Sequence, residues 1–295
     1  MGVYHAGSLA VQERVGVRER AEHVGRSLGQ GIKPVAAAFL ELQPLLVVGA
    51  ADPVTGRVWA SPLAGSPGFV RATGPRQMSV LGEPAPGDPL ATALTTPDTP
   101  VGTIAVDPRT RRRMRLNGRL RPTARGFAVT AEQVFSNCPK HIQRRESYEW
   151  AAERRPGVVR RLRQLDAEQR AFIASADTFF LATVHGTGAD VSHRGGNPGF
   201  VRATSPVDLI WRDYPGNAMF LTLGNLSTDP RAGLLFLDWT TGGTLHLSGE
   251  ARTEFGDDGE RTVRFTLTEA VHRPAALPLR WTAPEYSPAN PDIAR

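Results

Sequence analysis

The chain has 295 residues, of which 40% are hydrophobic and 22% charged, a composition typical of a globular protein with one large domain or two smaller ones. Its single cysteine, Cys138, excludes an internal disulfide and a cysteine-rich metal site, so we expect no bound metal. The net charge of +6 comes mostly from arginines interspersed with acids, without a nucleic-acid-binding motif, so we expect no nucleic-acid partner.

The N-terminus has no signal-peptide pattern, and no apolar run approaches the roughly 20 residues of a membrane span. We therefore expect a cytoplasmic protein that makes no contact with a membrane. Residues 8–28 have a helical pattern that ends between Gly29 and Gly31. We assign residues 1–38 to an N-terminal helical segment.

From residue 39 the pattern changes to short strands separated by turns. Apolar runs at 45–48 and 57–60 flank a turn-rich stretch, which predicts a β-hairpin. Further strands are predicted at 100–107 and 113–119, with Met114 and Leu116 on one face and Arg115 on the other. Residues 39–155 are predicted to form one β-barrel-like half.

Five arginines lie between positions 109 and 115. On a strand, Arg111, Arg113 and Arg115 would share a face and form a basic stripe suited to a cofactor phosphate or an acidic substrate. A solvated turn explains the same residues. The sequence leaves both interpretations open.

Residues 156–173 are expected to be helical with a break near Asp166, which forms a capping box with Gln169 and starts a second helix. Strands are expected at 179–183, 189–192, 231–238 and 244–250. In the last of these, Leu245 and Leu247 would share a face and His246 would lie on the other. Residues 156–272 are predicted to form a second barrel half, and 273–295 a proline-rich extended tail.

The two predicted halves contain an internal repeat. Residues 65–73, GSPGFVRAT, recur at 196–204 as GNPGFVRAT, identical at eight of nine positions. The flanking strand pattern also repeats. We therefore predict a mainly β protein with two related β-barrel halves, each preceded by a helix.

The loop before this repeat differs between the halves. Residues 192–196 read SHRGG, whereas the first half has SPLAG at 61–65. Ser192, Arg194, Gly195 and Gly196 offer a hydroxyl, a guanidinium and close backbone approach, all suited to a phosphorylated ligand. This asymmetry predicts a ligand site that the first half has lost, although a plain glycine-rich turn is the alternative.

Several longer motifs resemble the pyridoxamine 5′-phosphate oxidase-like split-barrel superfamily, and within it the predicted flavin-nucleotide-binding branch. They are ADTFFLAT at 176–183, DVSHRGGNPGFV at 190–201, DYPGNAMFLTLGNL at 213–226, DPRAGLLFLD at 229–238, LHLSG at 245–249, RRRMRLNG at 111–118 and NCPKHIQRR at 137–145. The resemblance covers roughly residues 39–252. It departs from the branch at His193, where proline is expected, and at Leu221, where asparagine is expected.

The resemblance implies a tandemly duplicated split barrel that binds FMN in a groove between two barrel units, paired within one chain or in a homodimer. The residues it implies for cofactor binding come from three segments of the chain: Ser192, His193, Arg194, Gly195 and Gly196; Asn217, Thr222 and Asn225; and Lys140 and Gln143. For the second segment, a turn followed by a helix start is the alternative.

The function implied is that of an FMN-binding flavoprotein, an oxidoreductase that acts on a small molecule with NAD(P)H or a reductase as electron donor. No catalytic residue is identified. Three alternatives stay open: a non-catalytic flavin carrier, a deazaflavin-binding barrel, and a haem-binding barrel that uses His193 or His246. Cys138 is interpreted as an inert packed residue rather than a redox centre.

Overall fold

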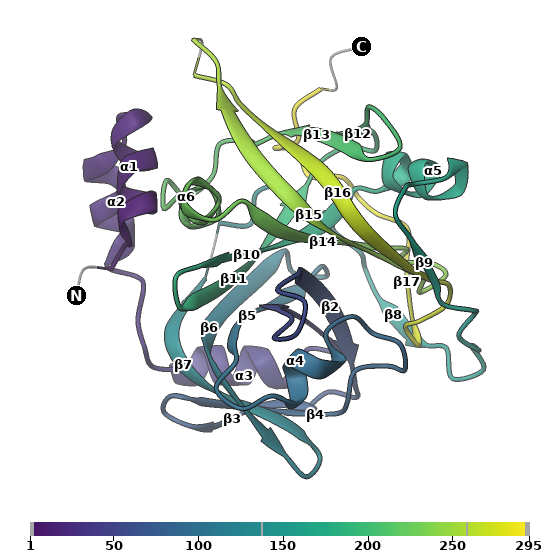
Figure 1. Cartoon of the computed structure of the whole chain (residues 1–295). Coiled ribbons are helices and arrows are strands. Elements are labelled where there is room, and N and C mark those ends of the chain that lie inside the picture. The colour runs from purple at the N-terminus through teal and green to yellow at the C-terminus, as the bar shows by residue number, and fades with distance from the viewer. Residues whose placement is uncertain (1–2, 137, 258, 293–295) are drawn as a thin grey trace.

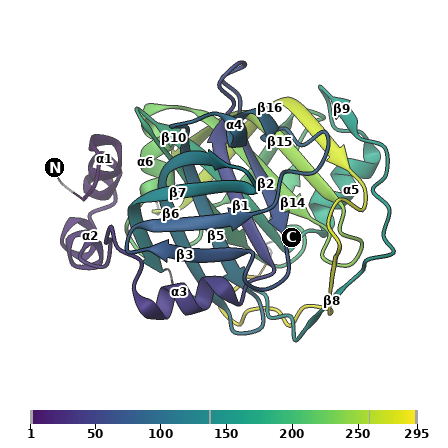
Figure 2. The same cartoon turned by 90° about the horizontal axis from the view of Figure 1, so that it is seen from below.

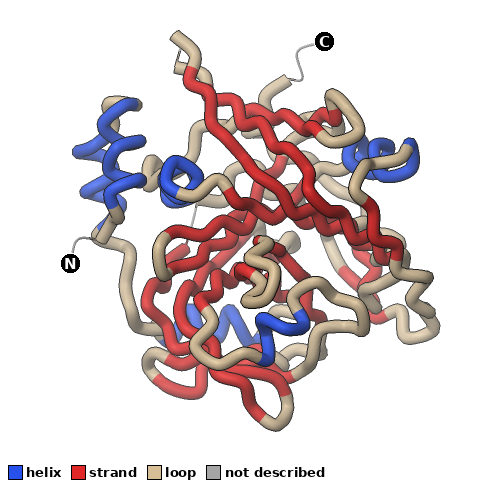
Figure 3. The backbone as a smooth tube through the Cα atoms, viewed as in Figure 1, coloured by secondary structure: helices blue, strands red, loops and turns tan. Residues whose placement is uncertain are grey.

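Two antiparallel sheets, one from each half of the sequence, dominate the computed structural model, which describes residues 3–136, 138–257 and 259–292 (Figures 1 and 3). The first sheet has the strand order β2-β1-β5-β6-β7-β4-β3. Its strands are β1 (Leu45–Ala51), β2 (Val58–Ala64), β3 (Val70–Gly74), β4 (Gln77–Leu81), β5 (Pro100–Asp107), β6 (Arg112–Thr123) and β7 (Gly126–Ser136). The predicted mainly β fold is confirmed.

The second sheet has the order β11-β10-β14-β15-β16-β13-β12, which matches the first sheet strand for strand. Its strands are β10 (Thr178–His185), β11 (Gly188–Gly195), β12 (Val201–Ala203), β13 (Asp208–Arg212), β14 (Arg231–Leu237), β15 (Thr244–Phe255) and β16 (Arg261–Arg273). As predicted, Met114 and Leu116 lie in the core of the first half, and Leu245 and Leu247 in the core of the second.

The long hairpins of the two sheets share an irregularity. The register shifts between Asn117 and Gly118 in one, and between Ser248 and Gly249 in the other. A side chain at either glycine would collide with the opposite strand, because its Cβ would lie 1.9 Å from a carbonyl oxygen at Gly118 and 2.1 Å at Gly249. Tandem duplication stays an interpretation of these matches.

Each half packs its outer hairpin on the other half, so the two pair within one chain (Figure 2). Strand β11 packs on β5 and β6, and β2 packs reciprocally on β14 and β15. Gly102 and Gly233 permit this approach, since a Cβ would lie 2.5 Å from Asp190 backbone atoms at the first and 2.7 Å from Trp59 Cα at the second. A shared apolar cluster, which includes Ile104, Phe180 and Leu235, fills the contact.

Six helices surround the sheets in the described part of the chain: α1 (Ala6–Arg14), α2 (Arg18–Gly25), α3 (Pro34–Glu41), α4 (Ala91–Thr95), α5 (Ala167–Ser175) and α6 (Leu221–Thr228). The helices predicted within 8–28 are present, interrupted at Gly16, whose φ is +69°. Helices α1 and α2 lie at one side of the molecule, with α1 next to α6 (Figure 1). None of the described helices is long and apolar enough to cross a membrane.

The helix predicted from residue 156 is wrong in its first part. Strand β9 (Arg160–Leu162) occupies that position and pairs with Ala270–His272 of β16. The spacing of Val158, Leu162 and Leu165 suited a helix, but Val158 is 82% exposed. Residues 270–272 of β16 lie beyond the part that pairs with β13, so their backbone groups are available to β9, and a helix would leave them unused. The second part is confirmed, because Asp166 and Gln169 form the capping box that starts α5.

The C-terminal segment runs over the surface and includes β17 (Leu279–Trp281), which pairs with β8 (Tyr148–Trp150). The predicted boundaries at residues 38, 155 and 272 stay predictions. The predicted segments 1–38, 137–145 and 273–295 include Met1, Gly2, Asn137 and residues 293–295, which lie outside the described residues.

Candidate functional site

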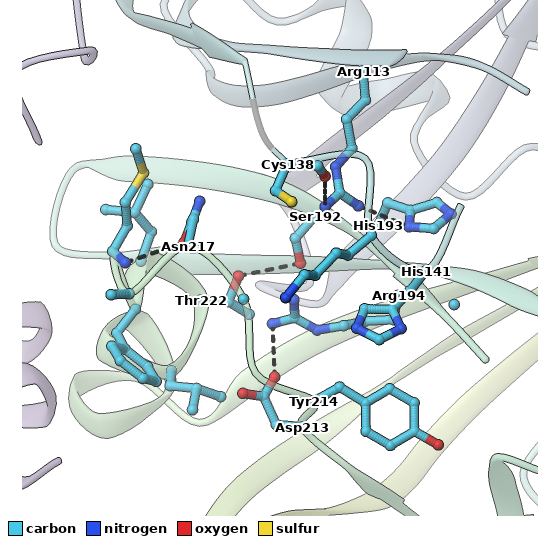
Figure 4. Close-up of a pocket in the computed structure, with 18 of the residues that line it drawn as sticks. Arg113, Cys138, His141, Ser192, His193, Arg194, Asp213, Tyr214, Asn217 and Thr222 are labelled. Carbon is cyan, nitrogen blue, oxygen red and sulfur yellow. Dashed lines mark hydrogen bonds and ion pairs between the residues drawn. The ribbon is translucent and has the colours of Figure 1, made fainter. Parts of the chain in front are cut away.

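A polar pocket lies where β11 of the second half meets β6 of the first (Figure 4). Its walls are the end of β11, the segment 138–141 that follows β7, the loop 212–220 and the first turn of α6. The enclosed volume is about 100 Å³. Both halves therefore contribute side chains to one site.

Five cationic side chains line this pocket: Arg113, Arg115, Lys140, Arg194 and Arg212. Arg113 donates one hydrogen bond to the carbonyl of Cys138 at 2.7 Å, and its Nη1 lies 2.9 Å from Nδ1 of His193. No carboxylate forms an ion pair with Arg113 among the described residues. Burial, with added repulsion from Arg115 and Arg194, lowers the pKa of Arg113 to about 9. Arg113 is thus a half-buried cation at neutral pH, and its hydrogen-bond partners are neutral.

The other three arginines each have a carboxylate partner, which for Arg212 is Glu260. Arg115 is paired with the buried Asp190, and burial still lowers the pKa of Arg115. Arg194 lies 3.2 Å from Asp213, which also pairs with Arg261 at 3.3 Å.

Four N–H groups of residues lining the pocket are buried without a hydrogen-bond partner in the described structure: Nε of Arg113, Arg115 and Arg194, and Nε1 of Trp211. Unsatisfied buried donors are costly, and they are typical of a site whose acceptor is a ligand.

The predicted loop 192–196 lies at this pocket. Ser192 accepts a hydrogen bond from the Thr222 hydroxyl at 3.1 Å and donates to the Leu181 carbonyl at 3.4 Å. Gly195 lies against the 138–141 segment so closely that a Cβ would be 1.9 Å from the His141 carbonyl oxygen. At Gly196, a Cβ would lie 2.6 Å from the Phe200 ring. Both glycines therefore serve close packing.

His193, where the superfamily pattern has proline, is buried between Arg113 and Arg194. Burial first, and then the charges of these two arginines, lower the pKa of His193 well below its ordinary value. The imidazole is therefore neutral at pH 7. Its Nδ1 accepts from Arg113, which assigns the ring proton to Nε2.

The loop before α6 carries Asn217, whose side-chain oxygen accepts from the Met219 amide at 3.1 Å. Ala218 and Phe220 have positive φ values of 62° and 52°, unusual for residues with side chains. Phe220 is the N-cap of α6 and makes no side-chain capping bond, so the first turn of α6, which contains Thr222, presents uncapped amides at the pocket.

Three residues predicted for cofactor binding lie outside the pocket lining: Gly196, Gln143 and Asn225. Gln143 is buried, where its amide group donates to the Gly196 carbonyl at 3.2 Å and its oxygen accepts from the Ser287 amide at 2.8 Å. Asn225 donates to Thr183 at 2.9 Å and contacts His5 at 2.8 Å, on the side of α6 that packs on α1. Gln143 and Asn225 therefore connect segments of the protein.

Asp190 and Asp213 are the site residues that the sequence analysis missed. Asp190 accepts from Asn117 at 3.0 Å in addition to its ion pair with Arg115. The sequence contained a signal for Asp190. It is an acid in a short predicted strand, and because it precedes Ser192 by two residues, both side chains lie on the same face of that strand. Arg113 and Arg115 belong to the predicted basic stripe. The structure buries Arg115 and half-buries Arg113, whereas Arg111 lies in the preceding turn with φ of 52°.

The region around Ser61 on β2, which is equivalent to the region around Ser192 on β11, has different side chains. Ser61 donates to Asp88 at 2.6 Å, and Asp88 pairs with Arg273 at 3.0 Å. Nδ1 of His246 lies 2.9 Å from the Ala60 carbonyl and Nε2 lies 2.9 Å from the Thr244 hydroxyl. All of these side chains are buried.

A haem ligand requires a ring nitrogen with a free lone pair. Both ring nitrogens of His246 are hydrogen-bonded, so His246 does not fit haem iron. Nδ1 of His193 accepts from Arg113, and the tautomer that this assigns carries its proton on Nε2, so it presents no lone pair to iron.

Comparison with known proteins finds a family model that is similar to the second half of the chain. Residues 165–288 match the family model described as pyridoxamine 5′-phosphate oxidase. This interval includes β10 to β16 and α6, and therefore the loops that form most of the pocket. A search of curated proteins found no match.

Among solved structures, similar chains include an FAD-binding protein from Mesorhizobium loti, with 12% identity over 40% of this chain and 99% of its own, at a TM-score of 0.30. A protein from Clostridium acetobutylicum related to general stress protein 26, of the pyridoxinephosphate oxidase family, has 12% identity over 34% of this chain and 81% of its own, at a TM-score of 0.27. A NimC/NimA family protein from the same organism has 15% identity over 34% and 79%, at a TM-score of 0.26.

Proposed function

Because the second half of this chain belongs to the pyridoxamine 5′-phosphate oxidase-like split-barrel superfamily, we propose that the pocket between the halves binds the phosphate end of FMN and that the protein is an FMN-dependent oxidoreductase acting on a small molecule. A bound flavin supplies the redox chemistry, and the electron donor is NAD(P)H or a separate reductase. The chain's own residues bind and orient the cofactor.

The observation that carries this proposal is the charge of Arg113. Its side chain is half-buried, with Nε fully enclosed, it is repelled by Arg115 and Arg194, and no carboxylate of the described residues pairs with it. A half-buried cation without a counter-ion is costly, so this arrangement favours an anionic ligand. A phosphate dianion would accept from the unpartnered Nε–H groups of these arginines and from the uncapped amides of α6.

The size of the pocket agrees with binding of the phosphate end rather than of the whole nucleotide. Its enclosed volume of about 100 Å³ is smaller than the roughly 300–1,000 Å³ of sites that enclose a complete ligand. Phe200, Tyr214 and Phe220 also line it and offer flat surfaces to an aromatic ring. We therefore place Ser192, Arg194 and Thr222 near the phosphate and ribityl chain, and the ring toward the open side.

The test is a titration of the purified full chain with FMN and with riboflavin, which lacks the phosphate, followed by flavin fluorescence. We expect FMN to bind about 10- to 100-fold more tightly, as charge-assisted hydrogen bonds contribute about 1.5–3 kcal/mol. In Arg113→Met the two ligands should bind within about threefold of each other. Equal binding of both ligands by the unmodified protein would contradict a phosphate site.

Reduction tests the enzymatic part of the proposal separately. Under anaerobic conditions, NADH or NADPH should bleach the flavin absorbance of the loaded protein, directly or with an added flavin reductase. Binding of FMN without reduction by any donor would support the alternative of a non-catalytic flavin carrier. Association of two chains into a homodimer stays a prediction.

A further inference from the structure

A second and larger cavity lies on the first half of the protein, beside α3. Its walls are α3, the connection from α2 to α3, and the ends of β6 and β7 next to the pocket described above (Figure 1). Its volume is about 720 Å³, within the range of small-molecule sites. Nothing in the proposed flavin chemistry uses it.

The outer wall of this cavity is held in place by backbone hydrogen bonds. The amide of Gly29 donates to the Val134 carbonyl at 3.1 Å, and the Val134 amide donates to the Gly29 carbonyl at 2.6 Å. Farther along, the Ile32 amide donates to the Pro75 carbonyl at 2.8 Å. The α2–α3 connection is thus fixed to the first sheet at two points, and the space beneath it is part of the fold.

The floor of the cavity is apolar. Phe39, Met114, Val134 and Phe135 line it, and all except Phe39 are buried in the protein core. Val35 of α3, at the rim, is 74% exposed. A side chain of this type on the edge of a preformed cavity is typical of a surface that an apolar ligand covers.

The rim of the cavity is cationic. Arg26, Lys33, Arg111 and Arg112 line it together with Arg113, and no aspartate or glutamate is among its described lining residues. Arg111 is paired with Glu285 at 3.0 Å. Arg26, Lys33 and Arg112 form no ion pair within the described residues. Some other surface arginines have an acidic partner, as Arg18 has Glu22 and Arg119 has Glu132.

We propose that this cavity binds a small amphipathic organic anion, with its apolar body on the floor and a carboxylate or phosphate at the cationic rim. Lys33 and Arg112 would approach the anion, and Phe39 and Val134 would contact the body. The proposal does not depend on the flavin. Arg113 lines both cavities and Arg115 lies over the ring of Phe135, so an occupant would lie beside the proposed phosphate pocket.

The experiment uses the fluorescent anion 8-anilinonaphthalene-1-sulfonate as the probe on the full chain, without added flavin. Octanoate and octanol, which share an eight-carbon body, compete for the probe. We expect one bound probe per chain, displaced by octanoate at a concentration about tenfold lower than by octanol, because only octanoate has the charge.

A pair of double variants separates the site from bulk charge. Lys33→Glu with Arg112→Glu should weaken probe binding about tenfold or more, and both residues are exposed, so the fold should be retained. The control is Arg121→Glu with Arg125→Glu, which makes the same charge change at the opposite end of the β6–β7 hairpin. It should leave binding within about twofold.

Three outcomes would overturn the proposal. Equal competition by octanol would show an apolar patch without anion recognition. Equal loss in both double variants would show a nonspecific effect of net charge. Absence of probe binding, together with a dimer in sedimentation that Lys33→Glu with Arg112→Glu dissociates, would show that a second copy of the chain covers the cavity.

Discussion

The two positions where the halves face each other use matching strands but balance charge in opposite ways. At one, where β2 meets β15, the side chain of Arg273 at the end of β16 is 4% exposed and pairs with Asp88, whose side chain is completely buried. At the other, β11 and β6 enclose Arg113, which has neutral partners only. The first arrangement supplies its own counter-ion, although Nε of Arg273 has no hydrogen-bond partner in the described structure. The second lacks an anion, and this is why we assign ligand binding to the second half alone.

The comparison also shows how one scaffold gives a closed or an open site. Ser61 and Ser192 occupy equivalent positions on β2 and β11, each in reach of the other half. Ser61 donates to a carboxylate, whereas Ser192 accepts from a threonine hydroxyl. Asp88, which precedes α4, therefore supplies the negative charge at the first position. At the second position, a ligand phosphate would supply that charge next to the start of α6.

The largest expected effect is at the closed position, by which we mean the buried group of Ser61, Asp88 and Arg273. Asp88→Ala leaves Arg273 buried without a partner, which should lower the free energy of unfolding by about 3–5 kcal/mol. Chemical denaturation monitored by tryptophan fluorescence measures this loss. A loss below about 1 kcal/mol would mean that the pair is not buried as described, and the contrast between the two positions would fail.

The pH dependence of stability should also distinguish the closed position. Burial lowers the pKa of His246 from 6.5 to about 4. The unfolded chain then binds a proton that the folded chain excludes between pH 6.5 and 4, so stability falls as pH falls through this window, by about 3 kcal/mol for this residue.

The measurement for His246 compares denaturation midpoints of the unmodified protein and of His246→Asn at pH 7 and pH 4.5. Burial also lowers the pKa of His5, His141, His185, His193 and His272, so the unmodified protein and the variant should both lose stability in acid. The variant should lose less. Parallel pH profiles for the two proteins would show that His246 does not titrate in this way.

At the open position, removal of the arginine should have little effect on stability. Arg113→Met removes a cation that has no carboxylate partner and relieves its repulsion with Arg115 and Arg194, so we expect a change within about 1 kcal/mol. Arg273→Met, which strands Asp88, should cost about 3 kcal/mol or more. Similar losses in the two variants would show that Arg113 is a structural residue like Arg273.

Much of the fold followed from the sequence because strand alternation and the repeat are local signals. Met114 and Leu116 face the core, while Arg115 and His246 face the opposite half, as their alternation predicted. Strand β9 was missed because its three residues are held by the edge of β16, far along the chain.

The candidate site was predicted in part. The loop 192–196 lies at the pocket, together with Lys140, Asn217 and Thr222. Gln143 and Asn225 have polar groups that could bind a cofactor, but these groups are hydrogen-bonded to Ser287 and His5, respectively. Residue type and local spacing do not reveal such partners, which are brought together only by the tertiary fold.

The smallest expected effect concerns the departure at His193. The equivalent position on β2 is Pro62, and both β2 and β11 are edge strands, where a missing amide is tolerated. His193→Pro should therefore change the free energy of unfolding by less than about 1 kcal/mol. It also removes the acceptor at 2.9 Å from Nη1 of Arg113, which leaves that donor for a ligand.

We expect FMN to bind His193→Pro as tightly as the unmodified chain or up to about threefold more tightly, in the same fluorescence titration. The control His193→Ala removes the imidazole without the proline ring and should give the same affinity. A loss of tenfold or more in both variants would mean that His193 positions Arg113 for the phosphate. The histidine would then be a specific adaptation of this site, and the proline at the closed position could not replace it.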